Sequence, residues 1–139
     1  NQYKCEECKK YVDAVRKTSI WETPEVLIIQ LKRFKNISTY LTKVRSTIKY
    51  PLTDLSLQKY YSEYFPRNHT YDLFGVIQHT GSLHGGHYIA HTKNFINNKW
   101  YEFNDSSVLY IPEDKIEQEL ISRDSYILFY KKKEYFNNE

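Results

Sequence analysis

The stretch that decides the fold runs from Tyr71 to Lys93 and reads YDLFGVIQHTGSLHGGHYIAHTK. Its two ends are rich in β-branched and aromatic residues, and its centre is rich in glycine and histidine, which is typical of two strands joined by a loop. All four glycines of the chain lie between Gly75 and Gly86, and four of the five histidines lie between His79 and His91. Because glycine adopts positive φ angles without steric cost, the cluster predicts one tightly shaped or mobile loop from Thr80 to Gly86.

A second strand pair is predicted directly after this stretch. Lys99 to Asn104 reads KWYEFN and follows the turn-forming pair Asn97-Asn98, so it should pair with His87 to Lys93. Asn104 and Asp105 would then bring a carboxamide or carboxylate oxygen against the His87 imidazole. Such an acceptor fixes the tautomer of the ring and leaves its other nitrogen free to take a proton from a nucleophile. These residue types are two thirds of a Cys-His-Asn or Cys-His-Asp triad, although many hairpins carry a histidine and an asparagine without any catalytic role.

The remaining segments predict an α+β domain that is mostly antiparallel sheet. Val26 to Phe34 (VLIIQLKRF) is a nearly continuous apolar run, which favours a buried strand. Val108 to Ile111 is a short apolar stretch that ends at Pro112, and a helix is expected from Pro112 to Ile121, with acidic residues in its first turn. Ser125 to Tyr130 (SYILFY) reads as a closing strand.

Composition excludes several classes of protein. A chain of 139 residues with 40% hydrophobic and 27% charged residues fits one folded domain. A net charge of +3 does not by itself imply nucleic acid as a partner, and no apolar run approaches the roughly 18 residues of a membrane span. Two cysteines cannot build a disulfide-rich secreted scaffold, which favours a reducing, intracellular location, cytoplasmic or nuclear.

Cys5 and Cys8 form a CxxC motif near the start of the chain. Two thiolates at this spacing supply half of a tetrahedral structural zinc site. The nearest histidine is His69, too distant in sequence to complete a two-Cys two-His finger. The alternatives are two unligated thiols or a redox pair, and the strand–helix context of a thioredoxin-like pair is missing.

His87 and His91 have the spacing HxxxH, which invites a second metal hypothesis. Position 88 is tyrosine rather than glutamate, and the segment reads as a strand. Four residues along a strand separate the two rings by about 13 Å, which is too far for one metal ion. We therefore expect His69, His79 and His91 to be ordinary core or solvent-exposed histidines.

Over about Tyr3 to Tyr130, the chain resembles the ubiquitin-specific protease family of cysteine-type deubiquitinases, which have a papain-like catalytic core. The resemblance rests on YKCEECKK followed by WETPEVLIIQLKRF, on YDLFGVIQHTGSLHGGHYIAHTK followed by KWYEFNDSSV, and on SYILFY. It covers the C-terminal half of that catalytic domain. The implied fold is the C-terminal palm with part of the fingers: residues 1–20 in the zinc-binding fingers, 21–130 in the palm with the histidine box, and 131–139 a polar tail.

The resemblance also implies roles for individual residues. His87 corresponds to the catalytic base, Asn104 takes the third triad position, and Asp105 follows as an assisting acidic neighbour. The loop from Thr80 to Gly86 corresponds to a substrate-gating loop beside the channel for the ubiquitin tail, and Lys35 to Ser46 to a second one. The expected substrate-binding residues are His84, Gly85, Gly86 and Tyr88.

The family's nucleophilic cysteine has no counterpart in this sequence, because the resemblance places Cys5 and Cys8 in the fingers as zinc ligands. The expected function is therefore part of a thiol-dependent deubiquitinase that cleaves after the C-terminal glycine of ubiquitin, with this chain inactive alone. The resemblance implies catalysis without a cofactor. The expected partners are ubiquitin, ubiquitinated proteins and the N-terminal half of the same catalytic domain, with no nucleic acid and no membrane. The alternative is a non-catalytic module, a pseudo-deubiquitinase that binds ubiquitin or a scaffold.

Overall fold

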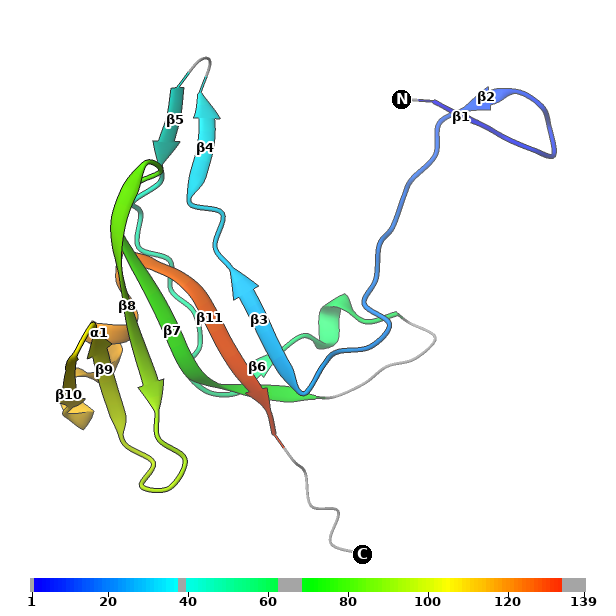
Figure 1. Ribbon diagram of the computed structural model, residues 1–139. Helices are drawn as coiled ribbons and strands as arrows, with labels where there is room; N and C mark the ends of the chain where they lie inside the picture. The colour runs from blue at the N-terminus through cyan, green and yellow to red at the C-terminus, as the bar shows by residue number, and fades with distance from the viewer. Residues whose placement is uncertain (1, 38–39, 63–68, 134–139) are drawn as a thin grey trace, which may run out of the picture.

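The computed structural model describes residues 2–37, 40–62 and 69–133, and a large antiparallel sheet organises them (Figure 1). Its seven strands are β3 (Val26–Gln30), β6 (Leu55–Ser56), β7 (Thr70–Ser82), β8 (Gly85–Lys93), β9 (Trp100–Asn104), β10 (Ser107–Ile111) and β11 (Ser125–Lys132). The strand order is β10-β9-β8-β7-β11-β3, and β6 pairs with the beginning of β7. Two hairpins stand outside this sheet, β1 (Tyr3–Lys4) with β2 (Tyr11–Val12), and β4 (Phe34–Ile37) with β5 (Tyr40–Lys43).

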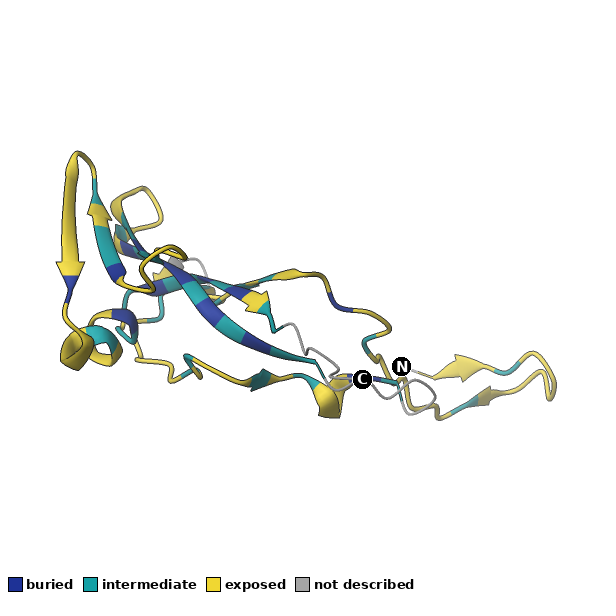
Figure 2. Ribbon diagram, turned by 90° about the horizontal axis from the view of Figure 1, so that it is seen from below, coloured by how far each residue is buried: buried dark blue, intermediate teal, exposed yellow. Residues whose placement is uncertain are grey.

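The hydrophobic core is formed by side chains from β7, β9, β10, β11 and α1. The first part of β7, from Thr70 to Gly75, alternates partly buried and buried residues, as expected of a strand with one face on a core. Figure 2 shows the same alternation as dark and light bands along the sheet. The buried hydrophobic cluster consists of Tyr71, Leu73, Val76, Trp100, Ile111, Leu120, Leu128 and Tyr130. Two core tyrosines keep their hydroxyl groups satisfied, because Tyr71 donates to the carbonyl of Pro24 and Tyr130 to that of Pro51.

The predicted strand from Val26 to Phe34 is two strands, which corrects the sequence-based expectation. The chain leaves the sheet after Gln30, and β4 begins at Phe34 in a separate hairpin. The reason is Arg33, which is 1% exposed and turns inward, donating to the carbonyl oxygens of Ser125, Val44 and Ser46. The expected burial is also wrong, because β3 is an edge strand and Val26 and Ile28 are exposed.

The glycine-rich segment is a tight hairpin rather than a long loop. Strand β7 continues to Ser82 and β8 starts at Gly85, so only Leu83 and His84 form the turn. Gly81 has a φ of 108° and faces Gly86 across the ladder, where a side chain at Gly81 would strike the backbone of β8. Glycine is therefore needed to bring the two strands together at the tip of the hairpin.

The helix expected after Pro112 is present but short. A 3-10 turn, η2 (Glu113–Lys115), leads into α1 (Ile116–Leu120), and a second 3-10 turn is η1 (Gln58–Tyr60). Leu120 is fully buried and its carbonyl accepts hydrogen bonds from Tyr50 and Ser125, which fix the helix end against the core. Within the described ranges, no helix is long and apolar enough to cross a membrane.

Candidate active site

His87 and Asn104 are hydrogen-bonded to one another at an exposed position on the sheet. The distance between His87 Nε2 and Asn104 Oδ1 is 2.7 Å. Because a carboxamide oxygen can only accept, Nε2 carries the proton in this pairing. The lone pair of the neutral imidazole is then on Nδ1, which is available to take a proton from an incoming group.

The register of the sheet explains how two residues seventeen positions apart meet. Strands β8 and β9 pair with Ala90 opposite Phe103 and His91 opposite Glu102. Continuing that register places His87 and Asn104 on the same face as diagonal neighbours, within reach of a long side chain. The pairing predicted from Asn97-Asn98 is confirmed, and Asn98 adopts a φ of 56° in the connecting loop.

Asp105 is a turn residue in the structure. It lies in the two-residue turn between β9 and β10, with a φ of 50°, a conformation that aspartate and asparagine tolerate better than most residues. Its side chain is exposed and, in the described part of the chain, forms no hydrogen bond with His87. The structure therefore brings Asn104, and not Asp105, to the imidazole.

A cavity of about 310 Å³ lies at the tip of the β7–β8 hairpin and gathers all four residues expected to bind substrate. Its lining consists of Phe34, His79, Ser82, Leu83, His84, Gly85, Gly86, Tyr88 and Tyr126. Three of its aromatic residues, Phe34, His79 and Tyr126, were not predicted from the sequence, because each lies in an apolar strand segment that reads as ordinary core. Successive residues of a strand point to opposite faces, so the cavity side of Tyr88 is opposite to the His87 ring.

His79 is one of the residues that line this cavity. It is 4% exposed, and its ring stacks against Tyr88 with centroids 4.6 Å apart. Burial lowers the pKa of His79, and the nearby Lys43 ammonium lowers it further, which favours the neutral form of the ring. A Cβ atom at Gly86 would collide with the His79 ring and with the Thr80 carbonyl, whereas a Cβ atom at Gly85 would enter open space.

A hydrogen bond and an ion pair of Lys43 anchor the β4–β5 hairpin to the sheet beside this cavity. Lys43 donates to the carbonyl of His79 and forms an ion pair of 3.3 Å with Asp124, which lies just before β11. Only 5% of the Lys43 side chain and 13% of the Asp124 side chain are exposed. The predicted second gating segment, Lys35 to Ser46, therefore contains a hairpin anchored at one end, and its residues 38–39 lie outside the described residues.

Cys5 and Cys8 lie in the β1–β2 hairpin, which Figure 1 shows well separated from the β7–β8 hairpin. Both thiols are free. The amide groups of Cys8 and Glu7 and the Cys8 thiol donate toward the Cys5 sulfur and lower the pKa of the Cys5 thiol. Hydrogen bonds from amide groups stabilise the thiolate form of a cysteine, and the thiolate is the form that binds metal ions.

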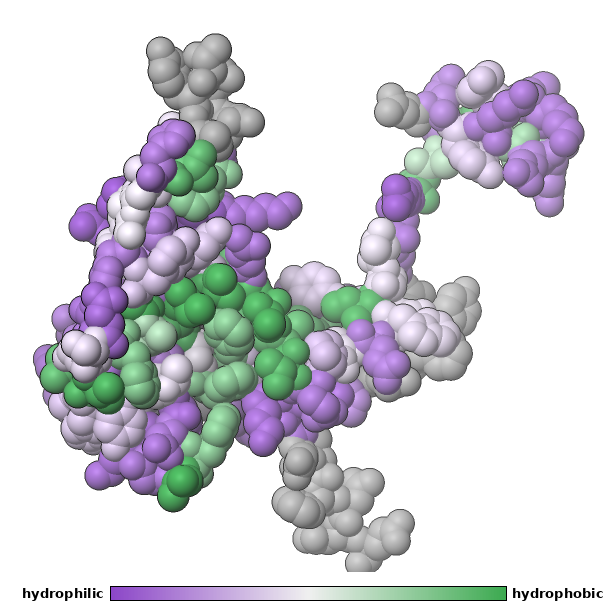
Figure 3. All heavy atoms as spheres, viewed as in Figure 1, coloured by the Kyte–Doolittle hydropathy of each residue, from purple (hydrophilic) through white to green (hydrophobic). Residues whose placement is uncertain are grey.

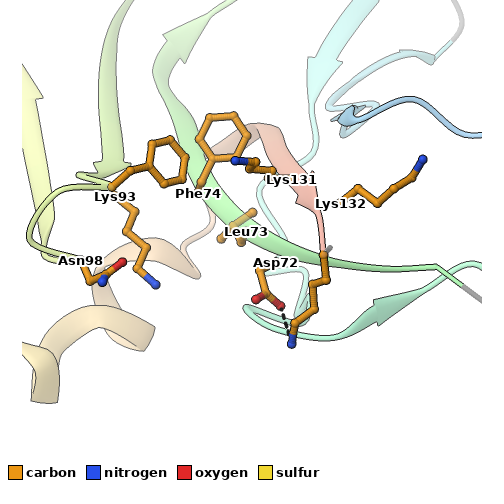
Figure 4. A pocket seen from close by; sticks show the side chains of 9 residues that line it. Asp72, Leu73, Phe74, Lys93, Asn98, Lys131 and Lys132 are labelled. Atoms are coloured by element: carbon orange, nitrogen blue, oxygen red, sulfur yellow. Dashed lines mark ion pairs between the residues drawn. The ribbon is translucent and has the colours of Figure 1, made fainter. Parts of the chain in front are cut away.

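Another cavity, of about 290 Å³, lies at the far end of β8 (Figure 4). Its side chains include Lys93, Phe74 and Lys133, and Figure 4 marks the ion pair between Asp72 and Lys133. Lys93 is six residues along the strand from His87, a separation of about 20 Å. This cavity is therefore separate from the His87–Asn104 pair.

Solved structures with the same architecture define the class of protein. The chain has a TM-score of 0.82 and 31% identity to a chain of the SAGA Ubp8/Sgf11/Sus1/Sgf73 DUB module bound to ubiquitin aldehyde, covering 96% of this chain and 30% of that one. A structure of the module described without ubiquitin gives a TM-score of 0.70 and 32% identity, covering 84% and 25%. The fold is thus the papain-like cysteine protease fold of the ubiquitin-specific type, represented by the C-terminal palm and part of the fingers.

Residues 1–130 match the family model described as ubiquitin carboxyl-terminal hydrolase, and the chain belongs to this family. It is 41% identical over 128 residues to ubiquitin carboxyl-terminal hydrolase 12 of Saccharomyces cerevisiae, covering 91% of this chain and 10% of that protein. It is 34% identical over 130 residues to ubiquitin carboxyl-terminal hydrolase 4 of Pongo abelii, covering 94% and 13%. The chain thus spans about a tenth of the length of these relatives.

Proposed function

We propose that this chain supplies the histidine and the asparagine of the catalytic triad of a thiol-dependent deubiquitinase. The enzyme would hydrolyse the bond after the C-terminal glycine of ubiquitin. The observation that carries the proposal is the 2.7 Å hydrogen bond between His87 Nε2 and Asn104 Oδ1, made at an exposed position next to a glycine-rich hairpin. Membership of the ubiquitin carboxyl-terminal hydrolase family supports the choice of reaction.

In the proposed reaction, Nδ1 of His87 takes the proton of a cysteine thiol, and the thiolate attacks the carbonyl carbon of the terminal glycine of ubiquitin. The imidazolium then donates this proton to the leaving amine, and a thioester remains. Water, deprotonated by the same ring, hydrolyses the thioester and releases ubiquitin. The N-terminal half of the same catalytic domain would supply the cysteine, because Cys5 and Cys8 lie in a separate hairpin (Figure 1).

We assign the binding of the ubiquitin tail to the cavity at the tip of the β7–β8 hairpin. The ladder between β8 and β9 ends at Ala90, so the edge of Gly85 to Ile89 that faces β9 carries no paired strand among the described residues. An extended tail ending in two glycines can approach this backbone closely at Gly85, where no neighbouring atom fills the position of a Cβ. His84, Gly86 and Tyr88 would form the walls beside it.

The test is His87→Ala in the complete natural protein that contains this chain, assayed with a ubiquitin C-terminal amide. We expect kcat to fall by a factor of roughly 10²–10⁴, the usual contribution of general acid–base catalysis. His69→Ala is the matched control, because His69 lies outside the cavity and the His87–Asn104 pair. Near-normal cleavage by a folded His87→Ala protein would contradict the proposal. A wild-type protein that binds ubiquitin without cleaving it would instead indicate a pseudo-deubiquitinase.

We further propose that Cys5 and Cys8 are half of a four-cysteine structural zinc site whose other pair lies outside this chain. The amide groups aimed at the Cys5 sulfur support this assignment. Replacing either Cys5 or Cys8 with serine should lower the zinc content of the complete protein by one equivalent.

The proposed partners are ubiquitin, ubiquitinated proteins and the N-terminal half of the catalytic domain, with no nucleic acid or membrane. The proposed location is the cytoplasm or the nucleus.

A further inference from the structure

Three side chains that commonly bind metal ions meet at the corner between β8, β9 and α1. His91 comes from β8, Glu102 lies opposite it on β9, and Glu119 comes from α1. One ligand atom from each residue lies within 4.8 Å of the other two, and His91 Nε2 is 3.3 Å from Glu102 Oε2. The group lies about 13 Å along β8 from His87, so it is separate from the proposed triad.

The backbone holds these three residues firmly in place. His91 and Glu102 face each other in the register of β8 and β9, and His91 is 2% exposed. On the helix side, the Gln78 side chain donates to the carbonyl of Glu119 at 2.6 Å, and the neighbouring Leu120 is fully buried. An ion bound here would therefore find one ligand atom of each residue already within 4.8 Å of the other two.

The charges at this corner are unbalanced. Within residues 2–37, 40–62 and 69–133, neither Glu102 nor Glu119 forms an ion pair with a lysine or an arginine. Lys115 lines the same cavity of about 180 Å³ without pairing with either carboxylate. Two carboxylates held this close repel each other, and a cation between them converts the repulsion into attraction.

The three side chains form a donor set that a zinc ion accepts. The imidazole is almost fully buried, yet in the described part of the chain its Nε2 has only the Glu102 carboxylate as a partner and its Nδ1 has none. One imidazole and two carboxylates are ligands that zinc accepts, at distances of about 2.0–2.2 Å. The cavity beside Glu102 and Glu119 leaves room for water as a fourth ligand.

We propose that His91, Glu102 and Glu119 form a binding site for a zinc ion that fastens α1 to β8 and β9. This site is distinct from the CxxC motif, and it does not depend on the proposed deubiquitinase activity. Its ligands come from three separate elements of the fold, so the bound ion would stabilise this corner of the sheet. Binding requires the two glutamate oxygens to close on the ion from their present spacing of up to 4.8 Å.

The test measures zinc per chain, by elemental analysis after equilibrium dialysis, in the complete protein and in Glu119→Gln. Glu117→Gln is the matched control, because Glu117 is an exposed glutamate of the same helix that is not among the three residues. We expect wild type and Glu117→Gln to hold one zinc per chain more than Glu119→Gln, with zinc affinity at this site reduced tenfold or more in the latter. The contribution of the CxxC motif is the same in all three proteins and cancels.

A second variant and a second measurement keep the test decisive. Glu102→Gln replaces a partly exposed ligand on a different element and should lose the same equivalent of zinc. If Glu119→Gln fails to fold, the comparison of wild type with Glu102→Gln provides the test. Added zinc should raise the unfolding temperature of wild type and of Glu117→Gln more than that of either ligand variant. Equal zinc content and equal thermal shifts in all four proteins would overturn the proposal.

Discussion

Asn104 decides which nitrogen of His87 carries the proton. Its side-chain oxygen accepts from Nε2 at 2.7 Å, which leaves the Nδ1 lone pair free. Without this acceptor the exposed ring would be free to rotate and to change tautomer. We therefore regard Asn104 as a positioning residue, which acts on the reaction through His87.

Asn104→Ala should lower kcat of the complete protein by tenfold or more, a loss of at least about 1.4 kcal/mol of transition-state stabilisation. Asn104→Asp retains an oxygen acceptor and should keep much of the activity. The measurement is kcat and KM with a ubiquitin C-terminal amide, and KM should change little because Asn104 touches His87 rather than the substrate. Equal activities for the Ala and Asp variants would contradict this role.

Gly85 and Gly86 are adjacent, but only Gly86 lacks space for a side chain. Gly86→Ala places a Cβ atom against the His79 ring and the Thr80 carbonyl, so it should destabilise the protein by about 1–3 kcal/mol, the usual cost of overpacking. Gly85→Ala enters open space and should leave the free energy of unfolding nearly unchanged while raising KM for the ubiquitin substrate. Urea unfolding and steady-state kinetics measure the two effects. A Gly85→Ala protein with unchanged KM would argue against substrate contact at this position.

Among the elements of the fold, the β7–β8 hairpin joins the proposed catalytic and substrate-binding residues. Its strands pair from Gly75 opposite Thr92 to Ser82 opposite Gly85, so His87 is held by a regular ladder rather than by a loop. Lys43 of the β4–β5 hairpin donates to the carbonyl of His79, and this contact connects the β4–β5 hairpin to the β7–β8 hairpin. The two predicted gating segments are thus two hairpins that share contacts at one cavity.

His79 should make the stability of this region depend on pH. Its pKa in the folded protein is lowered by burial and by Lys43, whereas an unfolded histidine titrates near pH 6.5. As pH falls below about 6.5, the unfolded chain takes up a proton that the folded chain does not, so folding stability declines by at most about 1.4 kcal/mol per pH unit. His79→Phe keeps a ring under Tyr88 and removes this titration. Its urea unfolding midpoint should fall less than that of wild type between pH 7.5 and 5.5, and an equal fall would refute the assignment.

Sequence patterns predicted the strands around His87 well and the segment after Val26 poorly. Alternation and turn residues identify β7, β8, β9 and β11, because hairpins between sequence neighbours depend on local chemistry. The break at Arg33 depends on carbonyl groups of Val44, Ser46 and Ser125, which are distant in sequence, so the apolar run alone could not reveal it.

The same limit applies to the candidate site. The strand pattern alone predicted an oxygen at position 104 or 105 beside His87, and the family resemblance indicated Asn104. The register of β8 and β9 brings Asn104 to the ring. Phe34 and Tyr126 reach the cavity from strands that read as core, so their part in it was not visible in the sequence. His91 and Glu119 are 28 positions apart and meet through the packing of α1, which periodicity does not encode.

At the scale of the whole molecule, the described residues leave hydrophobic side chains exposed on the sheet. Figure 3 shows hydrophobic side chains gathered over the sheet, and Val26 and Ile28 on its edge strand are exposed. An apolar sheet face of this kind marks an interaction surface. It supports the proposal that the chain acts together with an N-terminal half that carries the cysteine. Figure 1 shows the β1–β2 hairpin, which carries Cys5 and Cys8, well separated from the β7–β8 hairpin.

The central claim is that His87 activates a cysteine lying outside these 139 residues, and thiol alkylation tests it most directly. The complete protein is treated with iodoacetamide at pH 6, and mass spectrometry follows each cysteine in wild type and in His87→Ala. A thiol paired with an imidazole reacts as a thiolate at pH values well below the ordinary thiol pKa of about 8.5. We predict one rapidly alkylated cysteine in wild type, which is neither Cys5 nor Cys8, and a rate at least tenfold lower for that cysteine in folded His87→Ala. Equal alkylation rates in the two proteins would contradict the account.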